Sequence, residues 1–339
     1  MERPRKNSGW AASPRPADPA PQAGPRTPRS SARYTTITTV YAYPTAPAPK
    51  SRGGRGSGPE EEIYYDGQPR GPRRSYGWGG EKASGISYAA GVLPRPFSRE
   101  KVAMIEKETR GQWSNPKWHE WRKNRITASV AGAIAKSRFA NGRTLDVPQY
   151  YLKKVVGLHS RIRSQATNWG IENEKNAVKA YTKRKSRMER KQVYVKDCGL
   201  FVDKKHPWLA ASPDGIVVDA YTNEILCLLE VKCPYNYRNM TVSEACQDKN
   251  FCLETDGGFY WLKTTHPHYT QVQVQMKTSG VHNIDFVVYT KCDIVIVPVE
   301  FDLIFWTQTL PKLKKFYVDA VIPYLEEKNS PPACWDYEE

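Results

Sequence analysis

Apolar residues follow two different spacings along this chain. Segments 101–110, 116–137 and 167–185 repeat apolar positions at helical spacing, and 301–324 predicts an amphipathic helix or helix pair interrupted at a proline. Short apolar runs bounded by turn residues predict strands at 193–195, 199–202, 208–211, 216–218, 225–231, 284–289 and 294–299. The order of these elements predicts an α/β (α+β-like) fold, in which a central mixed β-sheet is flanked by helices.

The segment 271–276 alternates Gln and Val, which suits a strand, but the same residues could open a helix that ends at Gly280. Periodicity alone leaves both alternatives open. Upstream, 236–268 is expected to hold a helix and an irregular loop, with the aromatic run 260–262 buried. His266 and His268 favour capping or packing roles over a metal site, because no third soft ligand is near them.

The chain changes in composition near residue 95. Pro, Gly, Ser and Arg dominate residues 1–95, which predicts a disordered basic tail that serves as a linker or localisation segment. Loose binding of single strands or RNA through its Arg-Gly steps is the alternative. An ordered domain is expected over 96–328, followed by a short acidic tail at 329–339.

The charge balance narrows the class of partner. A net charge of +16 favours a polyanion, most plausibly nucleic acid. The seven cysteines are widely spaced and form no Cys-x-x-Cys pair, which argues against a disulfide framework or structural zinc site and for a reducing compartment. The sequence shows neither an apolar run of membrane-spanning length nor a signal peptide, so we expect a soluble intracellular protein without a membrane partner.

A predicted hairpin carries the candidate chemistry. Asp214-Gly215 is a turn signal between strands, and the second strand bears Glu230 and Lys232. Side chains two residues apart lie on one face of a strand, so the carboxylate and the ammonium point to one place near Asp214. Such a cluster suits metal-assisted phosphodiester cleavage, although a surface hairpin with an ordinary Glu-x-Lys pair is the simpler interpretation.

Five motifs in a fixed order resemble the lambda-exonuclease-type, or YqaJ, branch of the PD-(D/E)XK nucleases. The resemblance covers about residues 112–327 and implies a restriction-endonuclease-like core. The motifs are Arg122-x-x-Arg125-Ile126-Thr127-Ala128-Ser129, Trp169-Gly170-x-x-x-Glu174, Ser212-Pro213-Asp214-Gly215, Leu229-Glu230-Val231-Lys232-Cys233-Pro234 and Gln271-Val272-Gln273.

The resemblance implies a metal and its ligands. Asp214 and Glu230 would bind a catalytic Mg²⁺ together with the carbonyl of Val231, and Glu174 would reach the metal directly or through water. Mn²⁺ is the expected substitute, since all these ligands are hard oxygens. Lys232 would position or deprotonate the attacking water.

It also implies contacts to the substrate. Either Gln271 or Gln273 would hold the nucleophile side of the site. Arg122 and Ser129 match the positions that bind a terminal 5′ phosphate, and Arg125 is a further candidate.

The implied function is a Mg²⁺-dependent 5′→3′ exonuclease that acts on duplex DNA ends and releases 5′-phosphorylated products, in recombination, repair or viral genome processing. An endonuclease on the same fold and a non-catalytic nucleic-acid-binding protein remain alternatives. The resemblance further implies a homo-oligomer, a trimer, and an annealing-protein partner, and nuclear residence follows if the source is a eukaryote or its virus. The tail and the loop at 250–265 are left unexplained by the motifs.

Overall fold

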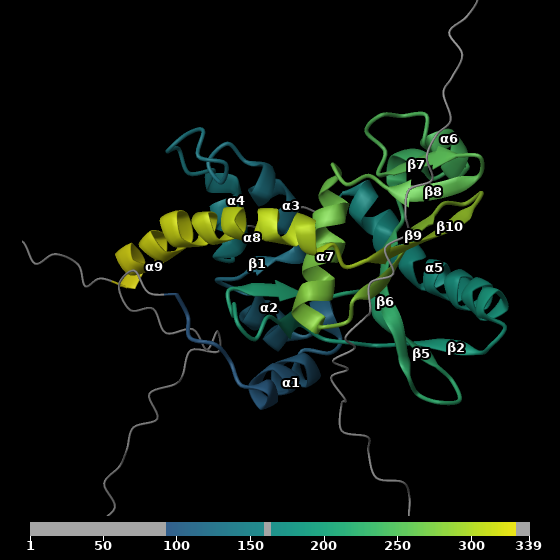
Figure 1. The fold of residues 1–339 in the computed structure, drawn as a ribbon, viewed down its shortest axis with the longest axis horizontal. Coiled ribbons are helices and arrows are strands. Elements are labelled where there is room, and N and C mark those ends of the chain that lie inside the picture. Colours follow the sequence, from purple (N-terminus) through teal and green to yellow (C-terminus); the bar gives the residue numbers. More distant parts are fainter. Residues whose placement is uncertain (1–92, 159–163, 330–339) are drawn as a thin grey trace, which may run out of the picture. The chain divides into compact units, whose positions relative to one another are not determined.

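The computed structural model describes residues 93–158 and 164–329 (Figure 1). Most of the tail predicted at 1–95 and nearly all of the one predicted at 329–339 lie outside the described residues, so both remain predictions. The first described helix, α1, begins at Arg99 and the last, α9, ends at Asn329.

A five-stranded sheet forms the centre of the described chain, in the order β10-β9-β6-β5-β2. β6 and β9 are parallel and the other neighbours antiparallel, so the predicted mixed sheet flanked by helices is confirmed. The strands are β2 (Val193–Lys196), β5 (Gly215–Asp219), β6 (Ile225–Lys232), β9 (Asn283–Tyr289) and β10 (Ile294–Glu300).

Two helices cover the two faces of this sheet. On one face, α5 (Gln165–Glu189) packs its buried Ala177 and Tyr181 against the odd-numbered side chains of β6, such as Leu229. On the other, α7 (Pro267–Ser279) packs against even-numbered positions such as Leu228. Because side chains alternate along a strand, Glu230 and Lys232 belong to the α7 face.

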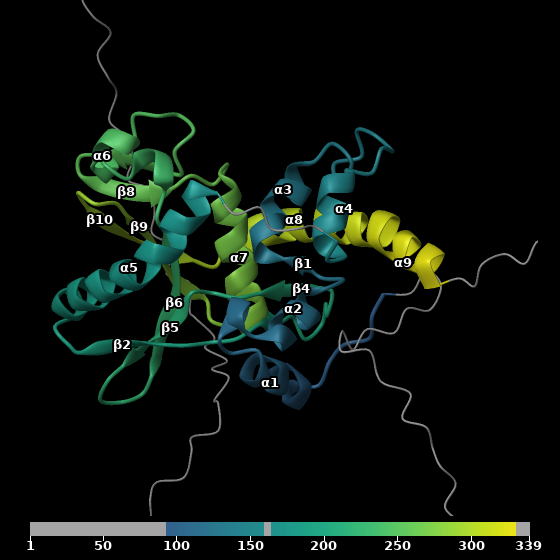
Figure 2. The same ribbon diagram turned by 180° about the vertical axis from the view of Figure 1, so that it is seen from behind.

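A second layer lies on the far side of α7, as Figures 1 and 2 show from opposite directions. It holds the small sheet β1-β4-β3 and an apolar core in which Trp208 stacks on Tyr317. Its elements are α1 (Arg99–Glu108), η1 (Gln112–Ser114), α2 (Pro116–Arg122), β1 (Ile126–Thr127), α3 (Ala128–Lys136), α4 (Gln149–Val155), β3 (Phe201–Val202), β4 (Leu209–Ala211), α8 (Leu303–Phe316), η3 (Tyr317–Val321) and α9 (Ile322–Asn329).

A third group lies between β6 and α7 along the chain. It comprises η2 (Tyr235–Tyr237), α6 (Val242–Ala245) and the hairpin of β7 (Leu253–Asp256) with β8 (Phe259–Leu262). The irregular loop expected here is therefore a hairpin. The predicted burial of 260–262 is wrong for Trp261, which is 42% exposed, and holds for Leu262.

Two further predictions need correction. The single helix predicted at 116–137 is two helices separated by a short strand, because Lys123 is extended, with a ψ of 142°, and Asn124 then adopts a left-handed φ of 61°. Pro311 lies inside α8 and does not interrupt it. Of the two alternatives left open for the Gln-Val segment, the structure has the helix, and α4 is a helix that the sequence did not predict.

Candidate active site

The β5–β6 hairpin brings Asp214 to the end of β6, as predicted. The backbone N–H of Asp214 donates to the carbonyl of Leu229 at 2.9 Å. In return, the N–H of Val231 donates to Asp214 Oδ2 at 2.7 Å. These two bonds fix the carboxylate beside Glu230.

Glu230 is the most buried of the predicted site residues on the hairpin, with 2% of its surface exposed. Its Oε1 forms an ion pair with Lys232 Nζ and accepts a hydrogen bond from Gln271 Nε2 at 2.5 Å. Its Oε2 accepts from Gln275 Nε2 at 2.5 Å. The carboxylate is therefore held from three directions.

The two glutamines on Glu230 lie one turn apart on α7. Gln275 was not predicted, and its signal in the sequence is the four-residue interval from Gln271, which matters only if the segment is helical. Gln273 faces the opposite way: it donates to the carbonyl of Glu300 at 3.0 Å and accepts from the N–H of Asp302 at 2.8 Å. Of the two predicted alternatives, the structure places Gln271 at the carboxylates.

The electrostatics of the cluster show an excess of negative charge. Burial raises the pKa of Asp214 well above its usual range, and the charge of Glu230 raises it further. The pKa of Glu174 is also raised, by desolvation and then by Glu230. Burial by itself would lower the pKa of Lys232, but the charges of Glu230 and Asp214 outweigh it and raise the pKa. The two carboxylates therefore favour the ammonium form of Lys232.

The residues present fit a hard divalent cation. Asp214, Glu230 and the carbonyl of Val231 offer oxygen atoms, and a cation would offset the repulsion that raises the pKa of Asp214. Gln275 Oε1, beside Glu230, is one of the buried side-chain atoms in the described chain that lack a hydrogen-bond partner, as expected where a ligand or water is missing.

Glu174 adds negative charge to the site from α5. Its side chain is exposed on α5 and acts electrostatically on Asp214. Within 93–158 and 164–329, no three His, Cys, Asp or Glu side chains are grouped closely enough to hold a metal together. A direct bond from Glu174 to the metal remains a prediction.

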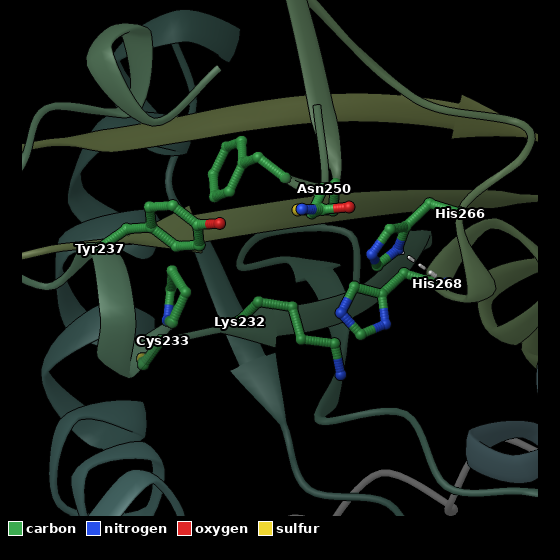
Figure 3. A pocket seen from close by; sticks show the side chains of 9 residues that line it. Lys232, Cys233, Tyr237, Asn250, His266 and His268 are labelled. Carbon is green, nitrogen blue, oxygen red and sulfur yellow. Dashed lines mark hydrogen bonds between the residues drawn. The ribbon is translucent and has the colours of Figure 1, made fainter. Parts of the chain in front are cut away.

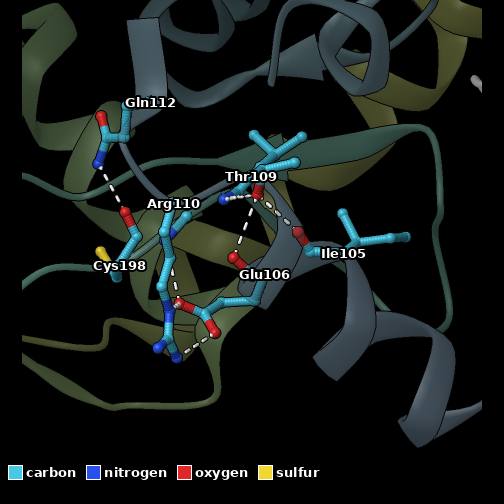
Figure 4. A network of polar contacts seen from close by, with 8 residues as sticks. Ile105, Glu106, Thr109, Arg110, Gln112 and Cys198 are labelled. Carbon is cyan, nitrogen blue, oxygen red and sulfur yellow. Dashed lines mark hydrogen bonds and ion pairs between the residues drawn. The ribbon is translucent and has the colours of Figure 1, made fainter. Parts of the chain in front are cut away.

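A polar network formed by α1, η1 and the residues between them supports the chain just before Asp214 (Figure 4). Gln112 Nε2 donates to the carbonyls of Cys198 at 3.2 Å and of Pro213 at 2.8 Å. Glu106 accepts from the N–H of Gly199 at 3.0 Å and is held by Arg110 at 2.8 Å. The turn that presents Asp214 is thereby anchored to a helix more than ninety residues upstream.

Arg122 is connected to this turn by contacts through Trp118. Its guanidinium stacks over the Trp118 ring at 4.0 Å, and Trp118 Nε1 donates to Ser212 Oγ at 2.7 Å. Ser129 is exposed at the start of α3, with its Oγ 3.3 Å from Thr127 Oγ1. A basic and a hydroxyl side chain of this kind suit a phosphate.

Arg125 does not share that setting. It is fully buried, donates to the carbonyls of Pro207 at 2.8 Å and Trp121 at 2.6 Å, and lies against the Trp121 ring. A buried guanidinium bound to backbone carbonyls stabilises the packing of this layer and is closed to a phosphate. The structure therefore contradicts the assignment of Arg125 to phosphate binding.

A pocket of ≈170 Å³ opens beside Lys232, between β6, the 250–252 loop and α7 (Figure 3). His266 and His268 line it, with ring centroids 4.5 Å apart. Burial lowers the pKa of His268 to about 2, and the Lys232 charge adds to this effect. His266 Nδ1 accepts from the N–H of His268 at 3.2 Å and caps α7, which agrees with the predicted capping role.

The known proteins that resemble this chain point to one family. Residues 117–282 match the family model described as the YqaJ-like viral recombinase domain. The alkaline nuclease of Autographa californica nuclear polyhedrosis virus is 26% identical over 247 residues, which cover 67% of this chain and 53% of that protein. The alkaline nuclease of Orgyia pseudotsugata multicapsid polyhedrosis virus is 28% identical over 203 residues, 55% of this chain and 42% of that protein. The chain thus spans about half the length of these relatives.

Among solved structures, the alkaline exonuclease LHK-Exo from Laribacter hongkongensis aligns with a TM-score of 0.45 at 22% identity, over 62% of this chain and 96% of that one. The shutoff and exonuclease protein of Kaposi's sarcoma-associated herpesvirus aligns with a TM-score of 0.41 at 11% identity, over 67% and 74%. Together, the motif order and the family match confirm the resemblance: residues 117–282 of this chain match the YqaJ-like viral recombinase domain family.

Proposed function

We propose that this chain is a divalent-metal-dependent nuclease that degrades linear duplex DNA from its ends. The observation that carries the proposal is the buried Glu230, held by Lys232, Gln271 and Gln275 beside a second carboxylate, Asp214, whose pKa is raised. This arrangement leaves negative charge uncompensated at a point fixed by the central strand. The alkaline nucleases to which the chain is similar support a hydrolytic role.

We assign the metal to Asp214, Glu230 and the carbonyl of Val231, with Glu174 adding charge from α5. Mg²⁺ is the proposed ion, with Mn²⁺ as its substitute, because the donors are all oxygens. When bound, such an ion polarises a phosphate oxygen and lowers the pKa of a coordinated water. Gln271 and Gln275 act as positioning residues that fix both oxygens of Glu230.

Lys232 serves as a cation toward the reacting phosphate. As a cation paired with Glu230, it is suited to donate a hydrogen bond to a phosphate oxygen and to stabilise charge there. A water adds to phosphorus, the bond from phosphorus to the 3′ oxygen breaks, and that oxygen takes up a proton. The products carry a 5′ phosphate and a 3′ hydroxyl.

Choice of the end is assigned to Arg122 and Ser129. The contacts of Arg122 lead through Trp118 and Ser212 to the Asp214 turn, which supports a terminal 5′ phosphate bound next to the cleavage site and hence 5′→3′ polarity, while Ser129 is assigned from the family resemblance. Action in recombination, repair or viral genome processing belongs to this proposal. A trimer, an annealing-protein partner and nuclear residence stay predictions from the family resemblance. None of the helices within 93–158 and 164–329 could span a membrane.

The test uses one labelled duplex in two forms, linear and covalently closed, with Mg²⁺ or with EDTA. The proposal predicts degradation of the linear form with Mg²⁺ and none with EDTA, and faster loss of ends that carry a 5′ phosphate. Nicking of the closed form would establish the endonuclease alternative. Binding without cleavage of either form at any divalent-ion concentration would establish the non-catalytic alternative.

A further inference from the structure

One face of α5 carries basic side chains that the proposed reaction does not use. Lys175, Lys179, Lys183 and Arg187 follow one another at intervals of four residues, and all are exposed. Residues at this interval lie on the same side of a helix, so the four, here called the α5 row, extend for about 18 Å along the axis.

The opposite face of α5 is internal. Ala177 and Tyr181 pack on the sheet, and the buried Lys185 forms ion pairs with Asp285 at 2.9 Å and Glu189 at 3.0 Å. Within the described chain, the ion pairs of α5 are made by Lys185 and not by the α5 row. The basic residue that the fold needs is thus separate from the row.

Helix stability does not account for this pattern. Between 175 and 187 the sequence has six basic and no acidic residues, whereas solvated helix faces ordinarily mix both signs. Like charges four residues apart repel one another and weaken a helix. The helix dipole favours cations only in the last turn, which covers Arg187 but not Lys175 or Lys179.

The α5 row extends from the candidate site at one end to a basic hollow at the other. At one end, Lys175 follows Glu174, whose charge acts on Asp214 in the candidate site. At the other end, Arg187 lines a hollow of ≈410 Å³ together with Arg190 and Lys191. Figure 1 shows α5 running from beside α7 to the far end of the sheet, so the positive charge continues away from the site.

We propose that the α5 row is a track for the phosphodiester backbone of duplex DNA outside the cleavage site. The inference rests on the proposed nuclease function and adds where the flanking duplex is held. A row of about 18 Å spans about five base pairs of B-DNA, and every phosphate it neutralises releases counterions, so binding depends on salt.

The test is equilibrium binding of the full chain to a fluorescent duplex of about 20 base pairs, in EDTA, across a salt series. The variant is K175Q/K179Q/K183Q/R187Q. The matched control, K107Q/K153Q/K204Q/K314Q, removes the same charge from exposed lysines elsewhere. The row variant is expected to bind about tenfold or more weakly, with the slope of log affinity against log salt reduced by about 3 to 4. The control is expected to change the slope by less than about 1.

Circular dichroism checks that each variant is folded. If the fourfold variant is unfolded, the double variant K179Q/K183Q replaces it and is expected to reduce the slope by about 2. A row variant that binds with the affinity and slope of the control overturns the α5 row and leaves the proposed function intact. A wild-type chain that binds with a steep slope but cleaves nothing overturns the proposed function and leaves the row standing.

Discussion

Two acid–lysine clusters lie on opposite faces of the same sheet, and they differ in how many carboxylates of the sheet share one lysine. The sheet cluster faces α5: Asp285 is paired with Lys185 at 2.9 Å and accepts from Tyr181 Oη at 2.6 Å, while Glu189 pairs with the same lysine from the helix. In the site cluster, on the α7 face, Asp214 and Glu230 share the single ammonium of Lys232, and the charge of Glu174 on α5 adds to theirs.

The two clusters show how a structural ion pair differs from a candidate metal site. In both clusters, burial by itself would lower the pKa of the lysine and the adjacent carboxylate charge raises it. Only the site cluster also contains a carboxylate, Asp214, whose pKa is raised well above its usual range. A buried pair that neutralises itself stabilises a fold at best modestly, whereas carboxylates that repel one another are the arrangement expected of the proposed cation site.

The largest contrast is expected in catalysis. Glu230→Gln keeps the shape of the side chain but removes a proposed ligand charge, so DNA cleavage should fall by about 10³-fold or more. Asp285→Asn, the matched change in the sheet cluster, should retain activity per folded molecule. Initial rates on linear duplex, normalised to the folded fraction, make the comparison. Equal losses in both variants would contradict it.

Stability should show the reverse order. Asp285→Asn leaves the buried Lys185 with Glu189 as its remaining charge partner and should lower the free energy of unfolding, by less than the about 3–5 kcal/mol expected when a buried charge loses its sole partner. Asp214→Asn removes one of the repelling charges and keeps an acceptor for the Val231 N–H, so in EDTA it should leave the stability unchanged or raise it. Urea unfolding of both variants in EDTA measures the two free energies of unfolding. A large loss in Asp214→Asn would mean that this carboxylate is a structural partner.

Two arginines three residues apart sharpen the same contrast on the substrate side. Arg122→Gln should reduce the preference for 5′-phosphorylated over 5′-hydroxyl ends by about tenfold, the value of one charge-assisted hydrogen bond. Arg125→Gln should instead lower the melting temperature, because its guanidinium holds buried backbone carbonyls. Competition between the two kinds of end in one reaction measures the preference. If Arg122→Gln leaves the preference unchanged, Arg122 does not bind the terminal phosphate.

The smallest effect is a pH dependence. Since the pKa of Asp214 is raised in the folded chain, the folded state binds more protons than the unfolded state between the ordinary carboxyl pKa and the raised one. In EDTA, stability should therefore fall as pH rises through that window, starting near the ordinary Asp pKa of about 4. Asp214→Asn should reduce this fall. Each 1 kcal/mol corresponds to about 2–4 °C in melting temperature for a domain of this size. Parallel curves for both proteins would contradict the assignment.

The hairpin was accessible from the sequence because its signals are local. An Asp-Gly turn between apolar runs and the period-two spacing of Glu230 and Lys232 place these side chains on one face without reference to the rest of the chain. The mixed sheet followed from the order of elements for the same reason.

The surroundings of the hairpin depend on contacts that local patterns do not encode. Gln271 and Gln273 are equivalent in an alternating strand, and only the helix reveals that Gln275, not Gln273, joins Gln271. Arg122 and Arg125 look alike in sequence, but α2 ends at Arg122, and the chain then turns through the left-handed Asn124 before Arg125, which is fully buried. Burial of this kind is decided by tertiary packing.

Calorimetric titration of Mg²⁺ into the full chain tests most directly whether the site cluster holds a cation. Wild type and Asp285→Asn should bind the ion, while Asp214→Asn and Glu230→Gln should lose the binding heat. Binding that survives both site substitutions, or its absence from the wild type, would contradict the account.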